Sequence, residues 1–95
     1  MHELGLTQRI LASALQRAAS AGADRVTALH LEIGEESDVA PESLEFYWPQ
    51  VARATAAEGA RLCFSTATDP WACRLVAIDV DEGPVREPPD DQAAD

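Results

Sequence analysis

The sequence contains no lysine, only two cysteines and no long apolar run. Its seven basic residues are all arginines and stand against 17 acidic residues, so the formal net charge is −10 over 95 residues. This acidity argues against nucleic acid and anionic membranes as partners, because like charges repel at contact distance. No apolar stretch reaches the roughly 20 residues that span a bilayer, and no signal-peptide pattern opens the chain. These absences predict a cytoplasmic protein.

The scarcity of cysteine and the lack of catalytic motifs limit the chemistry further. Cys63 and Cys73 form no C-x-x-C pair, which excludes a closed zinc site built from cysteine alone. Adding His2 and His30 gives no recognisable ligand spacing. The chain also lacks a G-x-S-x-G elbow, a phosphate-binding glycine loop and a helical His-Glu-x-x-His pattern. We therefore expect a protein that is not an enzyme.

The apolar content of 46% is ordinary for one small globular domain. Apolar residues at spacings of three and four predict a helix over residues 6–21. Alternation over residues 25–34 predicts a strand with one covered face, to which Leu29, Leu31 and Ile33 contribute.

Two prolines shape the prediction for the middle of the chain. Pro41 suits the first turn of a second helix, where its missing N–H costs nothing. Pro49 lies inside the same pattern and is expected to kink or break the helix. We expect the helix to resume through Ala57 and to end near Gly59.

Two further strands are predicted over residues 61–66 and 74–81, paired as an antiparallel hairpin around a turn at 68–71. The side chains expected to point inward are Leu62, Phe64, Val76, Ile78 and Val80. The order α-β-α-β-β predicts an α+β two-layer sandwich, a three-stranded mixed sheet with both helices on one face. Residues 1–82 would form this domain, and the acidic, proline-rich residues 83–95 a disordered tail.

The amino terminus carries the clearest candidate for chemistry. The terminal amine of Met1 and the amide nitrogen of His2 can close a five-membered ring on a metal, and the amide and the imidazole Nδ1 a six-membered ring. Glu3 can add its amide or its carboxylate. Planar, nitrogen-rich sites favour Ni(II) or Cu(II) over zinc. The amine has a reference pKa of about 7.7–8.0 and must lose its proton, so binding depends on pH.

Other candidates have ordinary interpretations beside functional ones. In a symmetric hairpin, Cys63 and Cys73 would lie opposite each other. They would then be two reduced thiols or, alternatively, would form a disulfide or a two-thiol metal site. His30 should point away from the helices beside Glu32, as an exposed pair rather than a metal ligand.

An acidic loop follows the first predicted strand, with Glu35, Glu36, Asp38 and Glu42. Such runs are typically solvated surfaces or charges at a helix start. The alternative is that the loop approaches the amino terminus, where Asp38 or Glu42 would supply an additional metal ligand.

Several segments together resemble one known family. They are Met-His-Glu-Leu at residues 1–4, the run Leu-Glu-Ile-Gly-Glu at 31–35, residues 39–46 and Glu-Gly-Ala at 58–60. This combination resembles the HypA/HybF family of nickel metallochaperones, which serve maturation of nickel–iron hydrogenase and, in some organisms, urease. The resemblance extends over residues 1–66 and resumes at about 74–82.

The resemblance implies a function and partners. It implies that Met1, His2 and Glu3 bind Ni(II) and that the protein delivers the metal to the hydrogenase large subunit, together with a nickel-insertion GTPase. A homodimer is left open. Family members usually carry a zinc ribbon built from two C-x-x-C pairs between the second and third strands. Residues 66–73 stand there instead, so no structural zinc is expected. A metal-free interaction module derived from the same scaffold is the alternative.

Overall fold

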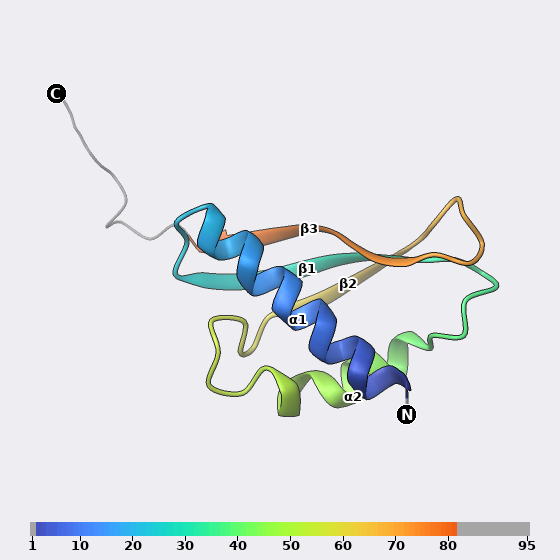
Figure 1. The fold of residues 1–95 in the computed structure, drawn as a ribbon, viewed down its shortest axis with the longest axis horizontal. Coiled ribbons are helices and arrows are strands. Elements are labelled where there is room, and N and C mark those ends of the chain that lie inside the picture. The colour runs from blue at the N-terminus through green and yellow to red at the C-terminus, as the bar shows by residue number, and fades with distance from the viewer. Residues whose placement is uncertain (1, 82–95) are drawn as a thin grey trace, which may run out of the picture.

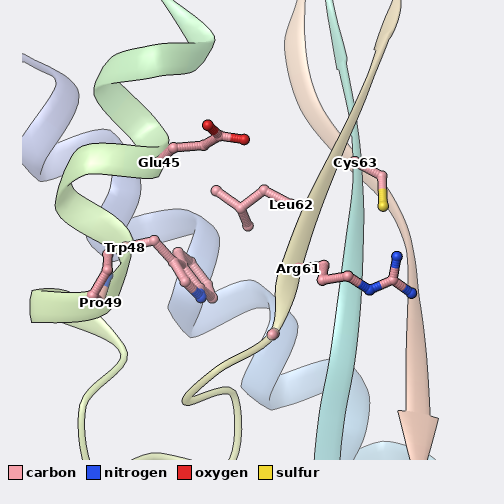
Figure 2. A pocket seen from close by; sticks show the side chains of 7 residues that line it. Glu45, Trp48, Pro49, Arg61, Leu62 and Cys63 are labelled. Atoms are coloured by element: carbon pink, nitrogen blue, oxygen red, sulfur yellow. The ribbon is translucent and has the colours of Figure 1, made fainter.

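The computed structural model describes residues 2–81 of the chain. Its elements are α1 (His2–Ser20), β1 (Arg25–Ile33), α2 (Pro41–Val51), β2 (Arg61–Thr66) and β3 (Cys73–Asp81). The three strands form one mixed sheet, and both helices lie on the same side of it (Figures 1 and 2). The predicted element order and two-layer α+β architecture are confirmed. The predicted tail at residues 83–95 lies outside the described residues.

The core is formed where α1 and α2 pack over the inner face of the sheet. Among its most buried members are Leu29 and Leu31 of β1, Leu44 and Trp48 of α2, and Ala14 of α1. Small alanines along α1 allow the helix to approach its neighbours closely. No helix within residues 2–81 is both long enough and apolar enough to cross a membrane.

The strand order differs from the predicted hairpin. The sheet order is β2-β1-β3, with β1 parallel to β2 on one side and antiparallel to β3 on the other. The parallel crossover from β1 through α2 to β2 is as predicted, but pairing between β2 and β3 is wrong. Burial explains why β1 is central, since Val26, Ala28, Leu29 and Leu31 are all buried along it.

A bulge in β3 changes which of its side chains face the helices. Leu31 of β1 pairs with Leu75 and His30 pairs with Ala77, so Val76 is the extra residue. Leu75 is therefore buried, whereas Val76 is 48% exposed. The prediction that Val76 points inward is wrong, because it assumed strict alternation along the strand and the bulge interrupts that alternation. Ile78 pairs with Leu29 and packs against the core as expected.

The second helix ends earlier than predicted. α2 continues two residues past Pro49 and ends at Val51, so a helical continuation through Ala57 is wrong. The chain turns instead at Ala54, whose φ is +64°, in the left-handed region that favours glycine. Hydrogen bonds from Thr55 N to Ala52 O (3.0 Å) and within the following turns hold this segment.

Replacing Ala54 by glycine is expected to raise the free energy of unfolding by about 0.5–1 kcal/mol, because glycine adopts the left-handed conformation without strain. The midpoint of thermal unfolding should rise by roughly 4 °C. The matched control is Ala12→Gly, on the exposed face of α1, which should lower stability by a similar amount. A lower midpoint for Ala54→Gly would contradict the strained turn.

The connection between β2 and β3 crosses the end of β1. Gly34 donates its backbone N–H to Ala72 O (2.8 Å), and Glu36 donates to Pro70 O (2.7 Å). A Cβ atom on Gly34 would lie 2.3 Å from the carbonyl oxygens of Asp69 and Pro70. Glycine is required here by this close approach of two backbone segments.

Candidate functional site

The amino-terminal motif is placed at the beginning of α1. This helix begins at His2, four residues earlier than predicted, so the backbone of His2 and Glu3 lies in its first turn. First-turn amides of an α-helix have no intrahelical carbonyl to bond. The amide nitrogen of His2, one donor of the predicted chelate, is therefore not committed to the helix.

A buried threonine fixes the first turn of α1. The hydroxyl of Thr7 donates a hydrogen bond to the carbonyl oxygen of Glu3, and Thr7 is 1% exposed. The Glu3 side chain is half-buried, and Leu4 is 39% exposed. α1 packs against α2, and its amino-terminal end lies over α2 in Figure 1. His2 and Glu3 thus belong to an anchored helix.

The structure does not assemble a metal site from its described side chains alone. Among the side chains that the structure describes, which do not include that of His2, no three His, Cys, Asp or Glu residues are grouped so as to hold a metal ion. Met1 lies outside the described residues. The ligand set of Met1, His2 and Glu3 therefore stays a prediction, as do the additional carboxylates Asp38 and Glu42.

The outer face of the sheet carries exposed ion pairs. His30 Nε2 contacts Asp79 Oδ1 at 3.2 Å, and Arg74 pairs with Glu32 at 3.0 Å. His30 is thus in an exposed pair, as expected, but with Asp79 rather than Glu32. The strand order explains the difference, because β3 lies directly beside β1 and brings Asp79 within reach.

The two cysteines do not face each other. Cys63 pairs across the sheet with His30, and Cys73 pairs with Ile33, on opposite sides of the central strand. Both are free thiols, and a symmetric cross-strand pair is wrong because β1 separates their strands. Partial burial raises the pKa of the Cys73 thiol. A closed structural zinc site needs four ligands, and these two separated thiols cannot form one.

Sequence reasoning missed a pocket between α2 and β2. It is a depression open to solvent with a volume of about 340 Å³, and Trp48 and Pro49 line it from the helix and Leu62 from the strand (Figure 2). The indole of Trp48 projects from α2 toward the start of β2 (Figure 2), and its Nε1 is buried without a hydrogen-bond partner among the described residues. A tryptophan N–H usually finds a partner when buried. In the sequence, only the large apolar side chain of Trp48 could have indicated this pocket, because the pocket forms when α2 packs beside β2.

Comparison with known proteins gives concordant matches. The family described as "Hydrogenase/urease nickel incorporation, metallochaperone, hypA" matches residues 1–84. Proteins named hydrogenase maturation factor HypA are 39% identical over 74 residues in Geotalea uraniireducens and 39% identical over 72 residues in Aeromonas hydrophila. These matches include 78% and 75% of this chain, and 64% of each relative's length. The chain therefore spans less than two thirds of these relatives.

A solved structure supports the fold. The solution structure of the Ni metallochaperone HypA from Helicobacter pylori matches with a TM-score of 0.69 and 12% sequence identity. The match extends over 82% of this chain and 96% of that chain. At this identity the likeness concerns the fold alone, and it agrees with the α-β-α-β-β order described above.

Proposed function

This chain belongs to the HypA family, and from that membership we propose that it carries Ni(II) for the maturation of a nickel enzyme. Nickel–iron hydrogenase is the first expected client and urease the other. The family is one of metallochaperones rather than enzymes, which agrees with the lack of catalytic motifs in the sequence. Nickel is here a cargo that is bound and released.

The observation that carries this proposal is the Met-His-Glu motif at the start of α1, inside the matched residues 1–84. The ligands would be the amine of Met1, the amide and imidazole of His2, and Glu3. A cation at a helix amino terminus is opposed by the helix dipole at a cost of about 0.3–1 kcal/mol. A deprotonated amide and the Glu3 carboxylate would offset that cost with negative charge.

The finer parts of the proposal concern the domain and its partners. We assign nickel binding to residues 1–82, with Asp38 and Glu42 as candidates for an additional ligand. The expected partners are a nickel-insertion GTPase and the hydrogenase large subunit, in the cytoplasm. No structural zinc is proposed, because Cys63 and Cys73 lie in the two edge strands with β1 between them.

Acetylation of the amino terminus is expected to lower the affinity for Ni(II) at least about tenfold, because it converts the amine donor into an amide. Since the chain has no lysine, the amino terminus is its one primary amine. An amine-specific reagent followed by hydroxylamine, which removes esters, therefore modifies this group alone. Titration calorimetry of the untagged protein before and after acetylation measures the effect. Equal affinities would reject the amino-terminal site.

A metal-free interaction module is the second candidate. The observation that favours it is the pocket beside β2, which is independent of the amino-terminal motif. The two functions separate by experiment. A protein that binds no Ni(II) but retains a partner after His2→Ala would support the module.

A further inference from the structure

The two edges of the sheet are protected to different extents. β3 has a bulge at Val76, and Arg17 donates from its guanidinium to the carbonyl oxygen of Leu75 (2.9 Å). Bulges and charges of this kind discourage another strand from pairing with an edge. β2 pairs regularly with β1 over residues 61–66. On its outer side no strand within residues 2–81 pairs with it.

The outer side of β2 borders the pocket described above. Trp48, Pro49 and Leu62 provide its apolar lining, and Glu45 of α2 is exposed beside them (Figure 2). Arg61 also lines the pocket, but its guanidinium extends away from α2 and leaves Glu45 as the charge on the helix side (Figure 2). Its volume of about 340 Å³ is many times the roughly 30 Å³ that one water occupies. The pocket therefore has room for a large apolar side chain next to a free strand edge.

Trp48 contributes a buried indole to the wall of this pocket. Trp48 is 4% exposed and its Nε1 has no acceptor among the described residues. Leaving a buried donor unsatisfied costs about 1–3 kcal/mol. The indole therefore offers the pocket the apolar part of its ring rather than its N–H.

We propose that the groove between α2 and the outer edge of β2 binds an extended segment of a basic partner protein. The segment adds a strand to β2, inserts one bulky apolar side chain against Trp48 and Leu62, and places a basic residue near Glu45. Strand addition supplies affinity through main-chain hydrogen bonds, and the pocket supplies specificity. Charge distinguishes this partner from a second copy of the chain, because two copies with a net charge of −10 repel each other.

Nuclear magnetic resonance tests this proposal on the nickel-free full chain. The chain has two tryptophans and therefore two indole N–H signals. Trp71 is 70% exposed and lies in the connection between β2 and β3, so it serves as an internal control. The signals are assigned with Trp71→Phe. The probe is the capped peptide Thr-Arg-Val-Leu-Val-Arg-Thr, added up to saturation.

The peptide is expected to shift the Trp48 signal and leave the Trp71 signal in place. Methylation of alternate peptide nitrogens on the pairing edge should abolish the shift, because it removes the donors needed for strand addition. Exchange of both peptide arginines for glutamate should weaken binding at least about tenfold. An unmoved Trp48 signal, or equal binding of the methylated peptide, would overturn the proposal.

Charge-reversal variants test the charge requirement. Glu45→Arg is expected to weaken binding of the arginine peptide at least about tenfold. Glu36→Arg, at an exposed position before α2 and outside the pocket lining, should weaken it less than twofold. Equal effects of the two variants would overturn the role of Glu45. A Trp48 signal that shifts with protein concentration in the absence of peptide, together with a doubled molecular mass, would overturn the proposal. It would show that a second copy of this chain occupies the groove. None of these outcomes depends on nickel binding.

Discussion

Replacement of His2 by alanine is expected to lower the affinity for Ni(II) at least about 100-fold. The imidazole closes the six-membered ring of the proposed chelate, so its loss removes a direct ligand. Substitution of groups that only support a ligand already costs about 10–100-fold. The measurement is calorimetric titration of the untagged chain, with the visible absorption of planar Ni(II) as a second readout.

The matched control is His30→Ala, since the chain has two histidines. His30 lies in the middle of β1 and contacts Asp79 on the outer face of the sheet. Its removal should change nickel affinity less than twofold, because it belongs to no group of ligands in the described part of the chain. Equal losses in both variants would contradict an amino-terminal site, and no loss in either would mean that Ni(II) is bound by other residues.

Replacement of Gly34 by alanine is expected to destabilise the fold by about 3 kcal/mol. The added Cβ would lie 2.3 Å from the backbone oxygens of Asp69 and Pro70, and backbone cannot move aside as a flexible side chain can. Overpacking a well-packed site typically costs about 1–3 kcal/mol, and this contact is at the severe end. The midpoint of thermal unfolding should fall by on the order of 15 °C.

Gly5→Ala is the control for the same chemical change. Gly5 lies within α1, and apart from its chain neighbours and the backbone of that helix no heavy atom lies within 4 Å of the position its Cβ would occupy. Alanine should therefore stabilise the helix there by about 0.5–1 kcal/mol. A Gly34→Ala protein that melts together with the unmodified chain would show that the connection at residues 67–72 does not press on Gly34.

Local patterns predicted the helices and strands because each pattern reports burial of one face. Leu29 and Leu31 are buried as their alternation predicts. The short connection between β2 and β3 suggested that these two strands pair with each other. β3 instead pairs with β1, so closeness along the chain did not predict its partner. The long run of apolar residues in β1 was the better indication, because a strand with a neighbour on each side is buried along most of its length.

Irregular backbone was predicted least well. Nothing in the residue type marks Val76 as a bulge or Ala54 as left-handed, since both conformations are imposed by surrounding contacts. The candidate nickel ligands could be proposed from the sequence because they are three adjacent residues, and they stay a prediction. The groove at Trp48 was not, because Trp48 and Leu62 belong to elements that are brought together only by folding.

The crossing of β1 by residues 67–72 also bears on how this architecture can gain or lose parts. β2 and β3 flank β1 at roughly 4.8 Å each, so the connection bridges about 10 Å, whereas six extended residues reach about 20 Å. The connection between β2 and β3 is therefore longer than the distance it has to span, and it lies at one end of the sheet. Doubling the length of a flexible loop costs only about 0.6 kcal/mol. A longer insertion at this end of the sheet would therefore cost little in chain entropy, and the strand pairings of β1 would not have to change.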